Sequence, residues 1–337
     1  MTLPDSAYLQ FTPDLRICRL LNGMWQVSGA HGQIEPVAAL KSMIDHHDAG
    51  YTTWDLADHY GPAEDFIGAF RQTLRQRDGE TALNAVQAFT KWVPRPMRMT
   101  RKIVQDAIDI SRRRMGVDTL DLLQFHWWEY TDKGYLEALD HLAALRTDGV
   151  IKHLALTNFD TVRVREITER GIKIVSNQVQ FSLVDRRPLS ALIPYCRQHG
   201  ITLLTYGTFG GGLISDAYLN QPEPRTLTTA SARKYKQMID QWGGWTLFQD
   251  LLRALRQIAD KHSVSIANVA TRWTLDQPAV AGVIGGVRLG VREHRADNAR
   301  LFAFTLDDAD HAQIDAVTAR GRDLMTLIGD CGAEYRR

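Results

Sequence analysis

A ten-residue stretch decides the fold: residues 52–61 read TTWDLADHYG. Residues 52–56 predict a short strand, because β-branched and aromatic side chains follow the turn residue Gly50. Asp55 stands at the end of this strand, and Tyr60 follows on the next loop, just before the turn at Gly61 and Pro62. In a parallel barrel the carboxylate and the phenol would face the same space, where barrel enzymes carry their catalytic residues.

The next two predicted strands end in side chains that complete a proton-transfer set. Residues 85–91 are an apolar run ending in Lys91, and residues 120–126 are another ending in His126. A tyrosine has an ordinary pKa of about 10, so it needs a nearby cation and little water to give up its proton. We therefore expect Tyr60 to be the acid and Lys91 to lower its pKa. Asp55 would hold Lys91, and His126 would polarise the substrate oxygen.

The rest of the chain alternates strands with helices after two short strand-like pieces within residues 8–20. The predicted barrel strands are residues 21–27, 52–56, 85–91, 120–126, 151–156, 174–178, 201–205 and 280–285. The predicted helices are residues 36–49, 64–74, 100–115, 135–147, 161–170, 189–199, 246–261, 265–275, 291–301 and 307–320. Eight such units predict an α/β protein with one closed (β/α)8 barrel. No GxGxxG follows the first strand, so a Rossmann site is not indicated.

Composition excludes several function classes. The 337 residues are 44% apolar and 23% charged, which suits a globular protein with a large core. A net charge of +1 predicts no nucleic-acid or membrane partner. The three cysteines, Cys18, Cys196 and Cys331, lie far apart without a CxxC, so we expect a reduced, cytoplasmic setting and no metal site. We see no signal peptide and no apolar run of about 18 residues.

The order and context of Asp55, Tyr60, Lys91 and His126 resemble the catalytic tetrad of the aldo-keto reductases. The resemblance runs along nearly the whole chain and implies an NAD(P)H-dependent oxidoreductase on a TIM barrel. Such an enzyme transfers hydride between the cofactor and an aldehyde or ketone, and in reverse it oxidises an alcohol. It also implies a single domain over residues 1–337. In it, residues 1–20 form an N-terminal hairpin that plugs the barrel, 211–245 a long loop after strand seven, and 303–337 a C-terminal helix and tail.

The resemblance also implies a site for the nicotinamide end of the cofactor. Thr157, Asn158 and Gln178 match positions that bind the carboxamide in the family, and amides suit a group that both donates and accepts. Tyr206 matches the ring on which nicotinamide stacks. The residues that follow resemble the family's loop under the pyrophosphate, where glycines let backbone N–H groups approach phosphate oxygens. From this loop we select Gly207, Thr208, Gly210 and Leu213.

A second part of the resemblance concerns the adenosine end. After the last strand come Gly286 and Arg288, and the pair Asp297 and Asn298 matches the family's adenine-binding acid and asparagine. The spacing is about two residues longer than the family pattern, so the arginine for the 2′-phosphate of NADP is either Arg288 or Arg292. These arginines favour NADP(H) over NAD(H).

Four tryptophans, Trp25, Trp92, Trp127 and Trp128, lie at or just past strand ends. They either pack under loops or form the walls of an aromatic substrate pocket. The partner would be a small-molecule carbonyl or alcohol. The sequence leaves open the natural substrate, the physiological direction and whether the protein is a homo-oligomer.

Two other functions stay open at this stage. One is a cofactor-bound regulatory subunit of the same fold, because an intact tetrad does not exclude it. The other is a metal-dependent barrel hydrolase using Asp55, His59 and His126. Such a site needs three or four converging ligands, and the first strand offers no HxH.

Overall fold

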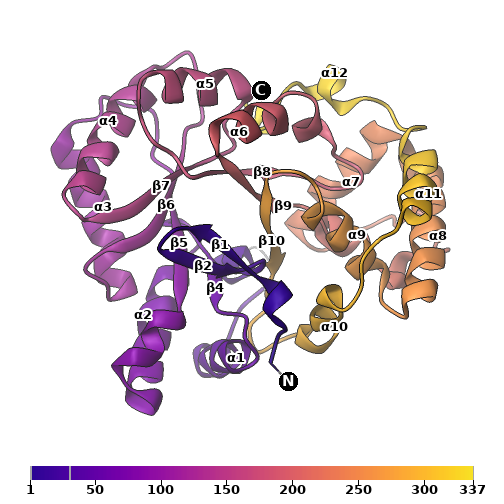
Figure 1. Cartoon of the computed structure of the whole chain (residues 1–337), viewed down its shortest axis with the longest axis horizontal. Coiled ribbons are helices and arrows are strands. Elements are labelled where there is room, and N and C mark those ends of the chain that lie inside the picture. The colour runs from indigo at the N-terminus through magenta and orange to yellow at the C-terminus, as the bar shows by residue number, and fades with distance from the viewer. Residues whose placement is uncertain (1, 30–31, 337) are drawn as a thin grey trace.

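The computed structural model describes residues 2–29 and 32–336. Within them, eight parallel strands close into a barrel in the order β10-β3-β4-β5-β6-β7-β8-β9 (Figure 1). These strands are β3 Leu20–Gly23, β4 Thr53–Asp55, β5 Gln87–Trp92, β6 Leu120–His126, β7 Ile151–Thr157, β8 Ser176–Gln180, β9 Thr202–Tyr206 and β10 Val280–Gly286. The predicted (β/α)8 barrel is confirmed.

The helices surround the barrel (Figure 1). They are α1 Pro36–Asp48, α2 Ala63–Asp78, α3 Arg101–Met115, α4 Gly134–Thr147, α5 Thr161–Glu169, α6 Leu192–His199, α7 Ala230–Trp242, α8 Gly244–His262, α9 Ile266–Leu275, α10 Arg295–Ala299, α11 Asp308–Thr318 and α12 Leu324–Ile328. Local chemistry sets their ends. In α3 the Thr100 side chain accepts from the Ile103 N–H, and Gly116 ends the helix in a left-handed conformation.

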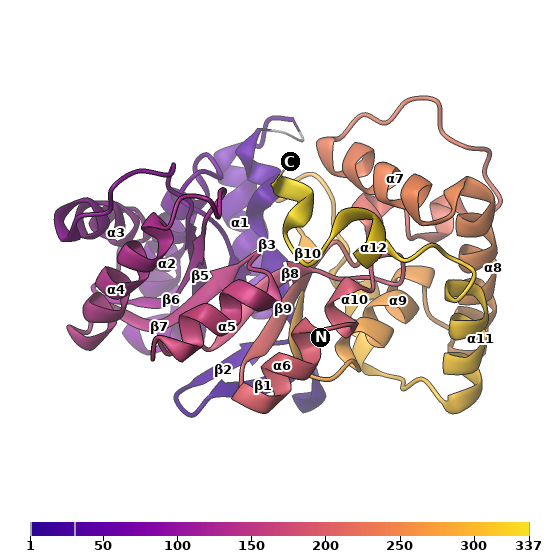
Figure 2. The ribbon, with the colours of Figure 1, turned by 90° about the horizontal axis from the view of Figure 1, so that it is seen from above.

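An antiparallel hairpin of β1 Tyr8–Thr12 and β2 Leu15–Cys18 lies at one end of the barrel (Figure 2). Its apolar side chains meet inward-facing residues of the barrel strands and form an inner apolar layer. This layer includes Phe11, Leu15 and Ile17 from the hairpin, and Leu21, Phe89, Leu122, Ala155, Leu204 and Ala281 from the strands. The hairpin end is therefore filled, and the opposite end, where the C-terminal segment lies in Figure 2, is the one that can carry a site.

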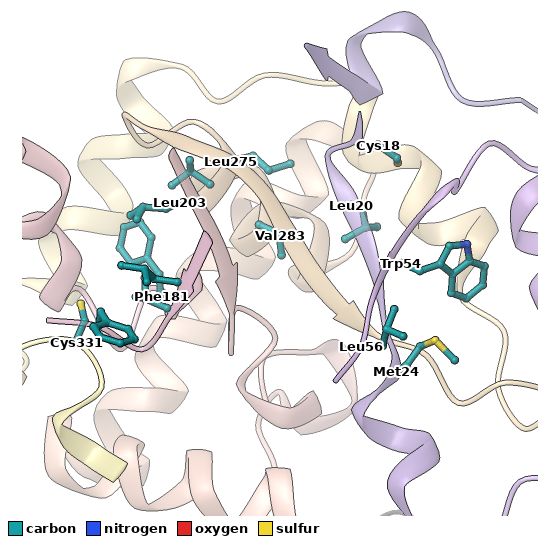
Figure 3. Close-up of a cluster of buried hydrophobic side chains, with 14 of the residues drawn as sticks. Cys18, Leu20, Met24, Trp54, Leu56, Phe181, Leu203, Leu275, Val283 and Cys331 are labelled. Atoms are coloured by element: carbon teal, nitrogen blue, oxygen red, sulfur yellow. The ribbon is translucent and has the colours of Figure 1, made fainter. Parts of the chain in front are cut away.

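A second apolar core lies between the strands and the surrounding helices (Figure 3). Trp54 on β4 belongs to it and packs against Phe70 of α2, with 5.6 Å between ring centres. Side chains alternate along a strand, so the outward direction of Trp54 turns Asp55 toward the barrel interior. Cys331 is also buried in this core, which fixes the start of the C-terminal segment.

Two predicted elements near the barrel mouth are wrong. The first strand does not run over residues 21–27: it pairs with its neighbours only as far as Gly23, and Met24–Ser28 form a 3-10 helix. Residues 211–245 are not simply a long loop, because α7 occupies their second half. Four of its residues have the spacing of one helix face: Tyr235, Met238, Ile239 and Trp242. The helix was not predicted, because charged residues lie between them and two prolines precede them.

The end of the chain also differs from expectation. In place of the predicted helix over residues 291–301, the structure has the shorter α10 and a 3-10 turn at Arg300–Phe302. The tail adds α12 and a 3-10 turn at Ala333–Tyr335, neither of which the pattern predicted. Met1 and Arg337, at the ends of the predicted domain, lie outside the described residues.

Candidate active site

A polar layer lies directly above the inner apolar layer. Because side chains alternate, Lys91 shares the inward face of β5 with Phe89, and Gln124 and His126 share that of β6 with Leu122. Asp55, Lys91, Gln124 and Gln178 are all buried there. The register of the parallel strands thus brings together polar residues from four separate segments of the chain.

Asp55 is the centre of the polar layer. Its Oδ2 accepts from the ammonium of Lys91 at 2.6 Å, and its Oδ1 accepts from the amides of Gln124 at 2.9 Å and Gln178 at 2.7 Å. The Lys91 ammonium also donates to the carbonyl oxygen of Leu56 at 3.0 Å. Burial lowers the pKa of Lys91, and the charge of Asp55 opposes that change. Gln124 was not predicted as a site residue, although its position two residues before His126 indicated the same strand face.

Tyr60 lies beside this ion pair, with the Lys91 nitrogen 5.1 Å from the centre of its ring. Removal from water raises the pKa of Tyr60 well above its ordinary value, and the nearby Asp55, Tyr335 and Asp58 raise it further. The lowering expected from Lys91 is therefore not the net effect here, because burial has the largest influence on this pKa. Tyr60 is held as a neutral phenol, which is the form of an acid that has a proton to give.

His126 is oriented by the next strand. Its Nδ1–H donates to the carbonyl oxygen of Thr157 at 3.0 Å. Burial and the positive charge of Arg336 lower its pKa to about 3, so the ring is neutral near pH 7. Nε2 then carries a lone pair, and this buried atom has no hydrogen-bond partner in the described part of the chain. In this form His126 can accept a hydrogen bond from a hydroxyl, whereas the predicted role was to polarise the substrate oxygen.

The three residues expected at the carboxamide lie together at the ends of β7 and β8. Asn158 has a left-handed backbone with φ +59°, and its N–H donates to the Gln178 carbonyl at 2.8 Å. The Thr157 hydroxyl is buried and unpartnered among the described residues. Gln178 donates to both Asp55 and Gln124 from its amide nitrogen. Its side-chain carbonyl oxygen is therefore the group that can accept a hydrogen bond from a ligand. This set of donors and acceptors fits an amide ligand.

The glycine-rich turn after β9 differs from the expected phosphate cradle. The N–H groups of Gly210, Gly212 and Leu213 donate to carbonyl oxygens within the turn at 2.9, 2.9 and 3.2 Å. Thr208 is buried and donates from its hydroxyl to the Phe181 carbonyl at 2.9 Å. Gly207, with φ +80°, lies against the ring of Tyr235. In this conformation the three N–H groups are therefore not available to a phosphate.

The residues expected at the adenosine end follow β10. The Asp297 carboxylate accepts from the Ser265 hydroxyl at 2.8 Å and from Asn268 at 3.3 Å, which fastens α10 to the start of α9. Asn298 is half-buried beside it, and Arg292 is exposed. The remaining residues of this set precede α10: Gly286 packs under the Gln26 side chain, and Arg288 is half-buried.

The tryptophans separate into two groups. Trp25 lies edge-on to Tyr60 with 5.0 Å between ring centres, so it stays a candidate wall of the pocket. Trp127 is fully buried and donates to the carbonyl oxygen of Glu129 at 2.7 Å, and Trp92 is 5% exposed. Trp92 and Trp127 are thus packed in the core, which agrees with the alternative that they pack under loops. Trp128, the fourth of these tryptophans, is 39% exposed and lies 4.4 Å from His126 between ring centres.

Two further observations concern metal-binding side chains and membrane-spanning helices. Within residues 2–29 and 32–336 no three His, Cys, Asp or Glu side chains gather closely enough to hold a metal ion. Asp55 already accepts from three donors, so the metal-hydrolase alternative gains no support. None of the described helices is both long and apolar enough to cross a membrane.

Comparison with known proteins identifies the family. The model of the Aldo/keto reductase family matches residues 19–319. The chain belongs to this family. As an aldo-keto reductase it is an NAD(P)H-dependent oxidoreductase, as the tetrad resemblance predicted. The preference between the two nicotinamide cofactors differs among similar proteins.

Three of these similar proteins illustrate the range. The NADH-specific methylglyoxal reductase of Escherichia coli (strain K12) is 22% identical over 316 residues, covering 89% of this chain and 94% of its own. A thermostable aldo-keto reductase solved with the inhibitor epalrestat has a TM-score of 0.71 at 21% identity, covering 92% of this chain and 99% of its own. An aldo/keto reductase from Klebsiella pneumoniae in complex with NADP and acetate has a TM-score of 0.69 at 19% identity, covering 93% and 95%. At these identities the structural matches establish the fold alone.

Proposed function

We propose that this aldo-keto reductase transfers hydride between NAD(P)H and an aldehyde or ketone, with Tyr60 as general acid. The observation that carries the proposal is the buried pair of Lys91 and Asp55, 2.6 Å apart, beside the ring of Tyr60. A tyrosine that gives up its proton becomes an anion, and a buried ammonium next to it stabilises that anion. The pair supplies a cation that is fixed before the reaction begins.

The proposed roles follow from the state of each side chain. When bound, NAD(P)H would supply hydride to the carbonyl carbon. Tyr60, whose raised pKa keeps it protonated, donates its proton to the carbonyl oxygen. Lys91 then stabilises the tyrosinate, and Asp55 holds Lys91 in position. His126, through the lone pair of Nε2, orients the hydroxyl group of the alcohol.

We assign cofactor binding to the residues named at the mouth. Thr157, Asn158 and Gln178 would hold the carboxamide, and Tyr206 would pack against the ring. The turn after β9 would follow the pyrophosphate after a local rearrangement of its N–H groups. For the substrate pocket we retain Trp25 and Trp128, which lie beside Tyr60 and His126 respectively.

NADP(H) is the cofactor that we propose over NAD(H). Support comes from Arg288 and Arg292, which bring positive charge to the loop that precedes Asp297 and Asn298. A guanidinium binds a phosphate in bidentate fashion, so an arginine here would recognise the 2′-phosphate that only NADP(H) carries. The similarity to an NADP complex agrees with this proposal, and the NADH-specific relative argues against it.

The test is loss of the absorbance of reduced nicotinamide with an activated aromatic aldehyde, using NADPH and NADH in parallel. We expect turnover with both and a higher kcat/KM with NADPH. A higher kcat/KM with NADH would overturn the cofactor preference alone. Tight cofactor binding without turnover on any of several aldehydes, ketones and alcohols would instead favour the regulatory subunit.

A further inference from the structure

The C-terminal segment of residues 332–336 lies across the candidate active site. The hydroxyl of Tyr206 lies 3.2 Å from that of Tyr335, which also accepts from the ammonium of Lys234. The ring centre of Tyr335 is 6.4 Å from that of His126 and 6.3 Å from that of Trp128. Tyr335 is therefore in contact both with the proposed nicotinamide residues and with the proposed substrate pocket.

Neighbouring residues fasten the segment from both sides. Glu334 accepts from the buried guanidinium of Arg187 at 3.0 Å, and Arg187 also pairs with Asp185 at 2.7 Å. Arg336 donates to the Trp127 carbonyl at 2.7 Å. Gly332, with φ +83°, packs so closely on the Asn158 carbonyl that a Cβ atom would lie 2.1 Å from its oxygen.

The segment touches residues that are proposed to bind the cofactor. The Tyr206 hydroxyl donates to the Asn158 side-chain oxygen at 2.7 Å, and the same hydroxyl contacts Tyr335. Lys234 lies 5.2 Å from the centre of the Tyr206 ring and 4.2 Å from that of Tyr335. The Tyr206 hydroxyl is thus shared between Asn158 and Tyr335, and the segment also lies against the backbone carbonyl of Asn158.

We propose that residues 332–336 are an autoinhibitory plug that must leave the nicotinamide site before NAD(P)H binds. This inference rests on the proposed function, because it takes Asn158 and Tyr206 as cofactor residues. The plug lowers the apparent affinity: when only a fraction of molecules is open, the apparent Kd is the intrinsic Kd divided by that fraction. The plug therefore sets the cofactor concentration at which the enzyme becomes active.

The closed arrangement does not satisfy every polar atom of the segment. Arg336 Nε and Nη1 are buried without a hydrogen-bond partner among the described residues. Unsatisfied buried polar groups oppose the closed state, whereas the ion pair of Glu334 with Arg187 favours it. The segment itself has only one 3-10 turn, Ala333–Tyr335, so little secondary structure is lost when it departs.

The test is a fluorescence titration of the full chain with NADPH and with NADH. Tyr335→Phe removes the hydroxyl that contacts Tyr206 and Lys234, and we expect the Kd for cofactor to fall about tenfold, because two hydrogen bonds of the closed state are lost. The matched control is Tyr195→Phe, which removes a hydroxyl bonded to Thr168 far from the mouth and should leave the Kd unchanged. An unchanged or raised Kd in Tyr335→Phe overturns the plug.

A second measurement on the wild-type protein needs no variant. Hydrogen exchange of the amides of Tyr335 and Arg336, which bond to Gly332 and Ala333 in the closed state, should speed up when NADPH is added. Slower exchange of these amides would mean that the segment closes over the cofactor, and it would overturn the plug while leaving the proposed function intact. Absence of cofactor binding in every form, Tyr335→Phe included, would overturn the proposed function and the plug together.

Discussion

The polar layer around Asp55 and the plug of residues 332–336 lie next to each other but are built in different ways. The polar layer is set by strand register: Lys91 is opposite Gln124, and His126 is opposite Thr157. The plug is set by side chains that come from distant parts of the chain, such as Lys234 and Arg187. A rigid layer fixes the proposed chemistry, and a separately held segment controls access to it.

The energetics of the two regions differ as well. Asp55 has three donors, and both members of its pair with Lys91 are almost fully buried. The plug combines one buried ion pair with two buried polar atoms, Arg336 Nε and Nη1, that have no hydrogen-bond partner in the described chain. We therefore expect changes in the polar layer to cost turnover or stability, and changes in the plug to alter cofactor affinity.

The largest effect is expected from Tyr60→Phe, which removes the proposed acid and keeps the ring. Turnover should fall by about 10²–10⁴-fold, the typical contribution of a positioned general acid. The Kd for cofactor should stay nearly the same, because the proposed carboxamide residues are untouched. Single-turnover kinetics with NADPH and an aldehyde would measure the first quantity and fluorescence titration the second.

Tyr51→Phe is a suitable control, because Tyr51 donates its hydroxyl to the Arg295 carbonyl at 2.8 Å, away from the polar layer. That variant should keep its turnover. If Tyr60→Phe kept more than about a tenth of wild-type turnover, Tyr60 would not be the acid. The proton would then have to come from another group at the mouth.

A smaller effect, on stability, is expected from Lys91→Met. It leaves Asp55 buried without its cation, and breaking a buried pair in this way typically costs about 3–5 kcal/mol. The free energy of unfolding in urea measures the loss. Lys102→Met is the matched control: it breaks a Lys–Asp pair whose side chains are 81% and 58% exposed, where such pairs are worth about 0–1 kcal/mol. Equal losses in the two variants would show that the amides of Gln124 and Gln178 suffice for Asp55.

The contrast between the two regions also explains what could be predicted from the sequence. The alternation of strands with helices predicted the barrel, and the apolar runs predicted the strand ends that carry Lys91 and His126, since both are local signals. The assigned roles of the tetrad stay predictions. Gln124 lies on the same strand face, so the alternation of side chains along the strand contained its position as well.

Long-range packing explains what was missed. Whether Trp127 or Trp128 faces the mouth depends on the loop that follows β6, and no local rule orients it. Tyr335 is 101 residues from Lys234, and Arg336 is 209 residues from Trp127, so no spacing pattern connects them. The raised pKa of Tyr60 follows from the same cause, since it depends on removal from water and on Tyr335 as well as on its strand neighbours.

The smallest expected effect is a change in the pKa of His126, which belongs to the polar layer but lies near a plug residue. Burial and the charge of Arg336, a plug residue, lower its pKa to about 3. In the wild-type protein without cofactor, the imidazole signals of His126 in a nuclear magnetic resonance titration should therefore stay constant between about pH 5 and 8. Arg336→Ala removes the cation and admits water, so the pKa of His126 should rise toward its ordinary value near 6.5. Its signals should then begin to shift as the pH falls below 7.

The control variant is Arg320→Ala, which breaks an exposed pair with Asp250 and should leave the pKa of His126 unchanged. A wild-type His126 that already titrates near pH 6.5 would mean that the plug does not keep water from the polar layer. The proposal that residues 332–336 control access to this layer would then be contradicted.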